Sequence, residues 1–318
     1  MSIRRAVLAA TPLAMIVTAA LAQQFPNHQP IEMTVMFGAG SAADITARQL
    51  AEGMAKHLGA PVPVVNRTGA GGALGYVHVA QQKPDGYSIV WNSNSISTAY
   101  HSGTLSLDFT AFDPVARVAI ENPALAVEAS APWKTLKDLI NYAKANPNKV
   151  RVGNSGTGSH THIASMALFS VAGAKVVPVP FGTAQAVVNL LGKRIEAVVQ
   201  LPQAIMPHAK SGKLRVLAVL GRARDPVFPD VPTAKEQGYE VALDMWRGIA
   251  VPKGTPKPVI AKLQDAIMKT VESTEFEAAG KNLGFTPAYL PAQAFGKVIA
   301  EDDQRLAETM KQMGLKRN

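Results

Sequence analysis

The sequence predicts an α/β protein made of two similar lobes. Segments with the pattern of a strand alternate with segments with the pattern of a helix, which indicates βαβ units around a parallel sheet. The alternation runs through the first half of the chain and begins again in the second half. Length supports the same division, because removing an expected export signal of 22 residues leaves 318 − 22 = 296 residues, which suits two domains better than one.

The first half contains strand and helix patterns in close succession. Short runs rich in Val, Ile and aromatic residues favour strands, and apolar residues spaced three and four apart favour helices. On these criteria we expect strands at 31–37, 62–67 and 87–91, and helices at 44–59 and 73–82. This order is typical of repeated βαβ units.

The second half repeats this pattern before the chain becomes mostly helical. We expect helices and strands in alternation at 136–146, 149–154, 162–173, 176–181, 186–194, 195–200 and 214–220. From Pro256 onward, residues 257–273 and 293–314 both carry apolar side chains at helical spacing.

The amino-terminal residues 1–22 have the features of a cleaved signal peptide. Arg4 and Arg5 precede a long apolar run that ends in Ala20-Leu21-Ala22, the small-x-small pattern of signal peptidase. We therefore expect export and cleavage after Ala22, through the Sec route or, because of the paired arginines, the twin-arginine route. No later stretch approaches the roughly 18 to 20 consecutive apolar residues of a membrane span, so a soluble mature protein is expected.

Composition excludes several classes of site. The chain has 32 Lys and Arg against 23 Asp and Glu, a formal net charge of +9. These charges are scattered, whereas nucleic-acid binders gather them in basic patches, so we expect no nucleic-acid partner. A diffuse positive field suits a protein that collects small anions. The absence of cysteine excludes disulfides, zinc–thiolate sites and cysteine nucleophiles.

Three turns rich in small residues lie between a strand and a helix, at 37–48, 66–75 and 151–169. Such turns can present backbone N–H groups at the positive end of a helix dipole, which makes them seats for anions. In the first turn, Ser41 or Asp44 can cap the helix. Loops at the carboxyl ends of parallel strands line the crevice where open α/β sheets bind ligands. The alternative for any single turn is that its glycines only allow a tight turn and close helix packing, without binding a ligand.

None of the glycine turns completes a sharper motif. A dinucleotide fingerprint starting at Gly69 needs glycine where Leu74 stands, and neither glycine loop contains GK[ST]. A nucleophile elbow centred on Ser155 needs glycine where Thr157 stands. An exported serine hydrolase that uses Ser155 and His160 on a carboxylate ester remains an alternative function, although the sequence around Ser155 does not match the hydrolase motif.

His160 and His162 do not indicate a metal site. At a helix start, two residues apart, their side chains point about 200° apart and cannot face one ion. Capping and packing roles are favoured, and we expect no metal and no cofactor.

Six short motifs together carry a family resemblance. They are NRTGAGG at 66–72, PDGY at 84–87, SGTGSHTH at 155–162, GKLRVLAV at 212–219, PDVPT at 229–233 and WRGIAVPKGTP at 246–256. With these motifs in this order, and over essentially the whole mature chain, the sequence resembles the Bug (TctC-like) substrate-binding proteins of tripartite tricarboxylate transporters.

The resemblance implies a periplasmic Venus flytrap fold. In such a protein two α/β lobes, each a mostly parallel sheet flanked by helices, are joined by crossing strands and close on one small ligand. Lobe 1 would comprise residues 23–122 and 246–318, and lobe 2 residues 123–245. The crossings would fall near Asn122-Pro123 and Trp246-Arg247-Gly248, and the carboxy-terminal helices would return to lobe 1.

The resemblance also implies a ligand site at the three turns. Family members hold one carboxylate of the ligand between the first two turns with backbone amides and bridging waters, and the second lobe adds amides and hydroxyls of the third turn. The ligand-binding residues carried over are Phe37, Gly38, Ala39, Gly40, Ser41, Ala42 and Asp44 in the first turn, Gly69, Ala70, Gly71 and Gly72 in the second, and Ser155, Thr157, Gly158, Ser159 and His160 in the third. No catalytic residue is expected.

Two further residues, Phe181 and Gln200, are expected beside the distal half of the ligand. Gln200 stands where the family commonly has an acidic residue. The lack of an acidic side chain at this position disfavours amino acids as ligands, because an ammonium group needs a carboxylate partner. We expect a di- or tricarboxylate, or an aromatic carboxylate stacked by Phe181 or Trp246.

These features together predict a solute-binding receptor and not an enzyme. The protein would capture a small organic carboxylate between its lobes in the periplasm. It would deliver the ligand to the subunits of a membrane transporter or, less commonly in this family, to a sensor. We expect it to act as a monomer.

Overall fold

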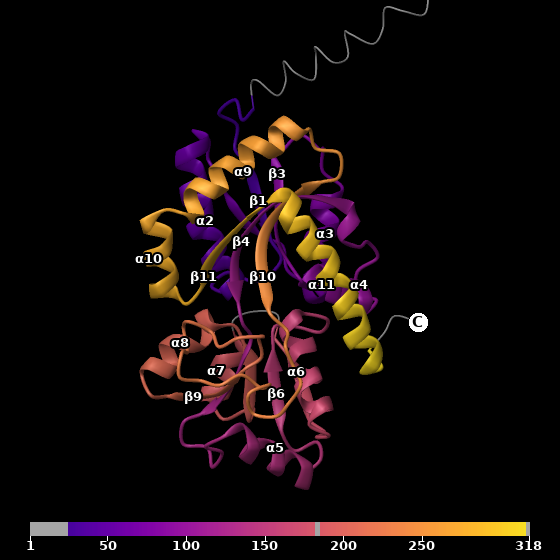
Figure 1. Cartoon of the computed structure of the whole chain (residues 1–318), viewed down its shortest axis with the longest axis vertical. Helices are drawn as coiled ribbons and strands as arrows, with labels where there is room; N and C mark the ends of the chain where they lie inside the picture. Colours follow the sequence, from indigo (N-terminus) through magenta and orange to yellow (C-terminus); the bar gives the residue numbers. More distant parts are fainter. Residues whose placement is uncertain (1–24, 182–184, 316–318) are drawn as a thin grey trace, which may run out of the picture.

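Two β-sheets, one in each lobe, organise the described part of the chain (Figure 1). The computed structural model describes residues 25–181 and 185–315. The expected signal peptide at 1–22, with its cleavage site after Ala22, lies outside these residues. In Figure 1 the first lobe combines the amino-terminal part of the described chain with the carboxy-terminal helices, and the second lobe contains the middle of the chain.

The first sheet has the strand order β11-β4-β10-β3-β1-β2. Its strands are β1 (Glu32–Val35), β2 (Val64–Asn66), β3 (Ser88–Ser93), β4 (Phe112–Glu121), β10 (Met245–Pro252) and β11 (Thr286–Pro291). β1 pairs in parallel with β2 and β3, as the alternation of strands and helices predicts. β10 is antiparallel to β3 and β4, and β11 is antiparallel to β4.

The second sheet has the order β7-β6-β8-β5-β9. Its strands are β5 (Ala124–Glu128), β6 (Arg151–Asn154), β7 (Val177–Pro180), β8 (Ala197–Gln200) and β9 (Leu214–Val219). β6 is parallel to β7 and β8, whereas β5 is antiparallel to β8 and β9.

The expected two-lobed α/β architecture is observed, but both sheets are mixed where mostly parallel sheets were expected. The antiparallel pairings lie around the strands that join the lobes. β4 carries the chain out of the first lobe, and β10 carries it back at the same end of the sheet. These two neighbouring strands therefore run in opposite directions. Local sequence patterns indicate single strands, and they carry no information on the direction in which distant strands pair.

The chain passes from the first sheet to the second at Asn122-Pro123, between β4 and β5. On the return path, Leu243 N donates to Leu220 O at 2.7 Å, and Met245 then pairs with Glu121 in the first sheet. The lobe boundaries at 122/123 and 245/246 stay a prediction.

Helices pack on the sheets in both lobes (Figure 1). Those of the first lobe are α2 (Ala42–Leu58), α3 (Ala73–Ala80), α4 (Ser95–His101), α9 (Lys257–Val271), α10 (Thr274–Leu283) and α11 (Ala292–Gln312). Those of the second lobe are α5 (Leu136–Ala145), α6 (His160–Val171), α7 (Gln185–Leu191) and α8 (Pro202–Lys210). Single helical turns occur at Ala70–Gly72 and Phe109–Ala111. Local signals set the ends of α2, because Ser41 caps its start and Gly59 ends it at φ +64°.

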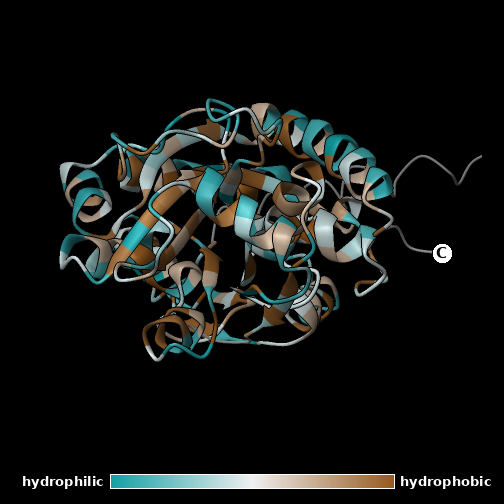
Figure 2. Ribbon diagram, turned by 90° about the horizontal axis from the view of Figure 1, so that it is seen from below, coloured by the Kyte–Doolittle hydropathy of each residue, from teal (hydrophilic) through white to brown (hydrophobic). Residues whose placement is uncertain are grey.

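Each lobe has its own apolar core. In Figure 2 hydrophobic residues concentrate on the strands and inner helix faces, and hydrophilic residues lie on the outward helix faces. A separate, small apolar cluster of Ala42, Leu201 and Met245 joins the start of α2 to residues of the other lobe and the crossing. Separate cores with a small contact between them suit lobes that move relative to each other.

The last helix, α11, contacts both lobes. Near its start, Phe295 packs edge to face on Trp246 with ring centroids 4.9 Å apart. Further along, Leu306 belongs to the apolar core of the second lobe. Figure 1 shows α11 running down the side of the first lobe to the second. Relative movement of the lobes must therefore bend or shift this helix.

Candidate functional site

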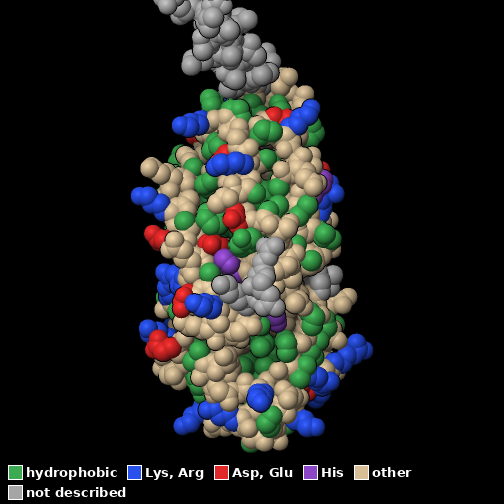
Figure 3. Space-filling view, turned by 90° about the vertical axis from the view of Figure 1, so that its right-hand side faces the viewer, with side chains coloured by type: hydrophobic (Ala, Val, Ile, Leu, Met, Phe, Trp, Pro, Cys, Tyr) green, Lys and Arg blue, Asp and Glu red, His purple; other side chains and the backbone are tan. Residues whose placement is uncertain are grey.

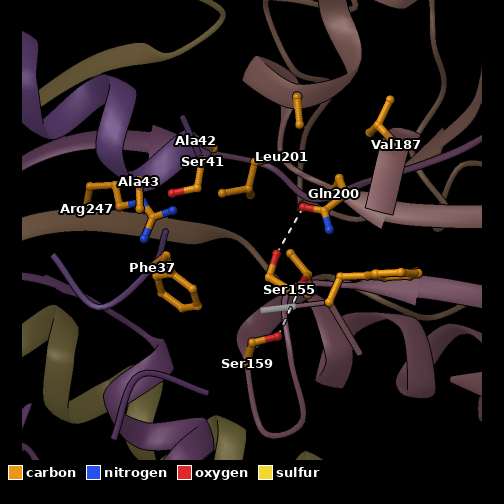
Figure 4. Close-up of a pocket in the computed structure, with 13 residues that line it drawn as sticks. Phe37, Ser41, Ala42, Ala43, Ser155, Ser159, Val187, Gln200, Leu201 and Arg247 are labelled. Carbon is orange, nitrogen blue, oxygen red and sulfur yellow. Dashed lines mark hydrogen bonds between the residues drawn. The ribbon is translucent and has the colours of Figure 1, made fainter. Parts of the chain in front are cut away.

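A small cavity lies between the lobes, where the first and third predicted turns meet (Figure 4). The residues that line it are Phe37, Ser41, Ala42, Ala43 and Arg247 from the first lobe, and Ser155, Ser159, Thr161, Phe181, Val187, Gln200, Leu201 and Ala204 from the second. Among these described lining residues none is acidic, and Arg247 alone carries a charge. The lining therefore suits an anion better than a cation.

The first predicted turn brings the start of α2 to the cavity. Ser41 Oγ caps the helix by accepting from Asp44 N at 3.3 Å. The amides of Ala42 and Ala43 belong to the first helical turn, and within the described residues no acceptor is bonded to them. The start of α2 thus offers unused backbone donors at the cavity.

Asp44 lies outside the cavity lining and holds the first turn in shape. Its Oδ2 accepts from Arg48 Nε at 3.0 Å and from Gly40 N at 2.9 Å, and its Oδ1 accepts from Asn66 Nδ2 at 2.9 Å. Burial by itself raises the pKa of Asp44, but these donors, led by Arg48, outweigh it and hold the pKa below its usual value. Both carboxylate oxygens are therefore committed to the turn.

Gly38, Ala39 and Gly40 belong to the same turn but do not line the cavity in the described structure. Gly38 O accepts from Ser41 N at 3.0 Å, which closes the turn, and Ala39 and Gly40 are exposed. Of the predicted residues in this turn, Phe37, Ser41 and Ala42 are the ones at the cavity.

The third predicted turn brings the start of α6 to the cavity from the opposite lobe. Ser159 is 1 % exposed and caps α6 by accepting from His162 N at 3.3 Å. The amides of His160 and Thr161 have no bonded acceptor within the described residues. Two helices from opposite lobes therefore begin at one cavity, and each contributes the positive end of its dipole.

Ser155 and Gln200 form a hydrogen-bonded pair in the cavity wall (Figure 4). Ser155 Oγ donates to Gln200 Oε1 at 3.0 Å, and Ser155 N donates to Thr161 Oγ1 at the same distance. Gln200 is buried, and among the described residues its Nε2 has no acceptor. This amide is a further donor for a ligand.

His160 does not pair with Ser155 in the described structure. The ring is fully buried, and its Nε2 lies 3.2 Å from Leu243 O. Burial lowers the pKa of His160 to about 4, so the ring is neutral at pH 7. A serine nucleophile needs its base within hydrogen-bond reach, and Ser155 donates to Gln200 instead. The geometry does not favour the hydrolase alternative.

The second predicted turn lines a neighbouring hollow of about 210 Å³. Its lining residues are Met36, Phe37, Gly69, Ala70, Gly71, Gly72, Thr104, Ser155, Gly156 and Thr157. Phe37 and Ser155 line both the hollow and the cavity, so the two spaces adjoin. The three predicted turns therefore do meet in one region, on the two sides of Phe37.

Gly71 marks a point where the lobes touch. A Cβ built on it would lie 2.5 Å from Thr157 O in the other lobe. On the same turn as Thr157, Gly158 also lies close to the first lobe, because a Cβ on it would lie 2.9 Å from Ser102 Oγ. The second and third turns are closed on each other, so a ligand entering here must part the lobes.

The cavity has a volume of about 30 Å³, which is room for one or two water molecules. Pockets for small organic molecules usually measure roughly 300 Å³ or more. A bound organic molecule therefore requires the lobes to lie further apart than they do here, or Phe37 to turn aside and join the cavity to its neighbouring hollow.

A larger groove of about 570 Å³ separates the lobes beside α8 and α10. Glu272 and Glu277 line it together with Lys210 and Lys281. In this groove the two acidic side chains offset the two lysines, whereas the lining of the cavity has a cation, Arg247, and no acidic residue, so the cavity is the better seat for an anion. We therefore take the smaller cavity as the candidate site.

Arg247 is the lining residue that sequence analysis missed. It lies on β10, is almost fully buried, and donates through Nε to Glu121 Oε2 at 2.8 Å. Its Nη1 has no hydrogen-bond partner within the described residues. Figure 4 shows the guanidinium beside Ser41 and Phe37. A charged residue inside the apolar run of residues 245–252 was the available signal, because a buried charge requires a partner.

The two aromatic residues expected to stack on a ligand differ in position. Phe181 lines the cavity, whereas Trp246 packs on Phe295 and donates through Nε1 to Asp302 Oδ2 at 2.8 Å. Neighbouring residues of a strand point to opposite faces, so Trp246 faces away when Arg247 faces the cavity. Stacking by Trp246 was therefore a wrong expectation.

Figure 3 shows one long face of the molecule, on which Lys and Arg side chains are spread over both lobes with acidic side chains between them.

Among the described residues, no three His, Cys, Asp or Glu side chains are grouped so as to hold a metal ion. In the same part of the chain, no helix combines the length and the apolarity needed to span a membrane.

Comparison with known proteins places this arrangement in a family. A model of the tripartite tricarboxylate transporter family receptor (TctC) matches residues 46–315. Protein BugT of Bordetella pertussis is 32% identical over 294 residues, which cover 91% of this chain and 90% of BugT.

Solved structures agree with the family match. The periplasmic binding protein BugD is 31% identical with a TM-score of 0.86, and the match covers 91% of this chain and 99% of BugD. MatC of Rhodopseudomonas palustris with bound malate is 25% identical with a TM-score of 0.82, over 90% of this chain and 99% of MatC. These matches confirm the two-lobed periplasmic binding protein fold, and the chain belongs to the TctC (Bug) family of solute-binding receptors.

Proposed function

We propose that this protein is an exported receptor that captures a small organic carboxylate between its lobes in the periplasm and delivers it to a membrane transporter. The observation that carries the proposal is the meeting of the starts of α2 and α6 at one cavity. The two helices belong to opposite lobes. A ligand bound to both therefore favours the closed arrangement over the open one.

Backbone amides supply most of the binding chemistry in this proposal. The free donors are the N–H groups of Ala42, Ala43, His160 and Thr161. They are neutral, held in place by their helices, and lie where the helix dipoles stabilise negative charge. A carboxylate can therefore bind without a dedicated cation for each oxygen.

The lining also supports an acid over an amino acid. None of the described lining residues is acidic, and Gln200 contributes an amide at the position where a carboxylate was expected in relatives. The ammonium group of an amino acid would lack a partner and would be repelled by Arg247. The relative MatC binds malate, which is a dicarboxylate.

We propose that the predicted site residues act in three ways. Those expected to contact the ligand are Phe37, Ser41, Ala42, Gly69, Ala70, Gly71, Gly72, Ser155, Thr157, Ser159, Phe181 and Gln200. His160 contributes its backbone amide, and Gly158 permits close approach of the lobes. Gly38, Ala39, Gly40 and Asp44 shape the first turn.

Family membership supports a membrane transporter as the recipient of the ligand. A sensor is the second candidate recipient. Cleavage of the signal peptide after Ala22 and a monomeric receptor belong to the same proposal.

Thermal unfolding with a panel of ligands tests the proposal. We expect malate, adipate or an aromatic acid to raise the Tm, by a stabilisation of about 2.7 kcal/mol at a hundredfold excess over Kd. NAD, ATP and divalent metal ions serve as controls. A rise with NAD or ATP and with no organic acid would show that the turns bind nucleotides.

A second assay separates the receptor from a hydrolase. The protein is incubated with a panel of nitrophenyl carboxylate esters, beside a Ser155→Ala variant. We expect no turnover above buffer. Turnover that disappears in Ser155→Ala would establish the hydrolase and reject the receptor proposal.

A further inference from the structure

We infer that Arg247 is the specificity-determining residue of the cavity, and that it binds the carboxylate of an organic acid whose carbon body is largely apolar. The inference rests on the proposed function. It adds the cation that recognises the ligand and narrows the class of acid.

Arg247 has a buried donor with no partner. Its side chain is 2% exposed, and within the described residues Nη1 makes no hydrogen bond. Buried polar groups in proteins almost always have a partner. Arg247 lines the cavity, so a ligand bound there would bring an acceptor to the guanidinium. A carboxylate oxygen is the acceptor best matched to a guanidinium.

Glu121 fixes the guanidinium without satisfying Nη1. Its Oε2 accepts from Arg247 Nε at 2.8 Å, and its Oε1 accepts from Thr46 Oγ1 at 3.0 Å and Gln203 Nε2 at 2.5 Å. Both carboxylate oxygens are therefore occupied. The ion pair sets the orientation of Arg247 before a ligand arrives and leaves Nη1 for it.

The start of α2 strengthens the same site. Ala42 and Ala43 line the cavity with Arg247, and their amides have no bonded acceptor in the described structure. Figure 4 shows Ser41 and Ala43 on the same side of the cavity as the guanidinium. An acid group placed there would meet a fixed cation and the positive end of a helix dipole together.

The remainder of the lining selects the carbon body. Seven of the 13 described lining residues are apolar, namely Phe37, Ala42, Ala43, Phe181, Val187, Leu201 and Ala204. A hydrocarbon chain or ring gains from burial against them. A polyhydroxylated acid would leave hydroxyl groups buried without partners, which is unfavourable. The ligand class is therefore an aliphatic or aromatic acid with few hydroxyl groups.

Calorimetric titration tests the inference. The probes are a panel of aliphatic and aromatic mono- and dicarboxylates that includes benzoate and adipate, with gluconate as the polyhydroxylated acid and benzamide as the uncharged analogue of benzoate. We expect the wild type to bind panel acids more tightly than gluconate. Arg247→Met should weaken the binding of the best acid by roughly 10- to 150-fold, the loss of one charge-assisted hydrogen bond.

Two further variants distinguish a loss of ligand binding from a loss of folding. Arg247→Met leaves the buried Glu121 without its cation, so the double variant Glu121→Gln/Arg247→Met removes both charges. Arg117→Met is the matched control, because Arg117 is a partly buried arginine on β4 whose Nε donates to Ala288 O away from the cavity. Circular dichroism and thermal unfolding establish that each variant is folded.

The outcomes separate the two proposals. Loss of affinity in the folded double variant, with a reduced preference for the acid over its amide and with Arg117→Met unchanged, supports the inference. A double variant that binds the acid as tightly as the wild type, with the same preference over the amide, rejects the role of Arg247 and leaves the receptor proposal intact. Absence of binding to every acid in the wild type rejects both.

Discussion

Arg247 and Glu121 form a buried ion pair on the two strands that join the lobes, with Nε and Oε2 2.8 Å apart. Gln203 of α8 reaches the same carboxylate from the second lobe. A buried pair is stable only when hydrogen bonds satisfy its remaining atoms, and Thr46 and Gln203 do this for Glu121. The pair therefore connects the cavity, the crossing strands and the opposite lobe.

Gln203→Leu should shift the protein towards a more open form. The substitution removes the hydrogen bonds from Gln203 Nε2 to Glu121 Oε1 and Thr46 Oγ1, which link the second lobe to the first. Small-angle scattering without ligand should give a larger radius of gyration than the wild type. Gln304→Leu, an exposed glutamine on α11, is the control. Equal radii for wild type and Gln203→Leu would mean that this contact does not hold the lobes.

Gly71→Ala should weaken ligand binding by obstructing closure. Its Cβ would lie 2.5 Å from Thr157 O across the lobes. Gly59→Ala is a matched control, because Gly59 has nearly the same φ (+64° against +65°) and nothing within 4 Å of the added Cβ. Both variants should lose roughly 1–2 kcal/mol of stability to left-handed backbone strain. In titrations with the best acid, only Gly71→Ala should lose affinity, and an equal loss in both would remove the closure argument.

The local elements of the site could be predicted from the sequence. Ser41 was expected to cap the helix that follows it, a role that depends on its own neighbours, and the structure shows it in this role. The turn around Ser159 is likewise local, since Ser159 caps the helix that follows it. For this reason the first and third turns were found at the cavity.

The roles that depend on distant partners could not be predicted. Arg247 is fixed by Glu121, which lies 126 residues away in the sequence. The family resemblance placed Asp44 of the first turn at the ligand, but in the described structure Asn66, 22 residues later, donates to one of its oxygens. The mixed sheets have the same cause, because pairing between β4 and β10 is decided by the crossing of the chain and not by either strand alone.

Asp44→Asn should act on the fold of the first turn and not on ligand charge. Asp44 accepts from Arg48, Gly40 and Asn66, so an amide at this position leaves at least one partly buried donor without its acceptor. We expect a loss of roughly 1–3 kcal/mol in the free energy of unfolding, measured with urea at pH 7. The pKa of Asp44 is lowered, so the wild type should begin to lose this advantage as the pH falls below the ordinary carboxylate pKa and should have lost it once the pH has fallen through the lowered pKa. A stable variant that loses ligand binding outright would instead indicate direct contact with the ligand.

His160 should make the stability of the fold depend on pH below neutrality. Burial lowers the pKa of His160 from 6.5 to about 4. As the pH falls between these values, His160 therefore becomes protonated in the unfolded chain but stays neutral in the folded protein. Stability is therefore fully present above about pH 6.5 and decreases towards pH 4, by roughly 3 kcal/mol for this group. Urea unfolding at pH 7.5 and pH 4.5 measures the loss.

The comparison with His160→Gln isolates this contribution from the carboxylates that titrate in the same range. Glutamine can still donate to Leu243 O, as Nε2 of His160 can at 3.2 Å, but it takes up no proton. The variant should therefore lose less stability than the wild type between the two pH values, while His57→Gln, at an exposed position of α2, should lose as much as the wild type. If the wild type and His160→Gln lose equal stability, the folded protein does not keep the His160 ring neutral between these two pH values.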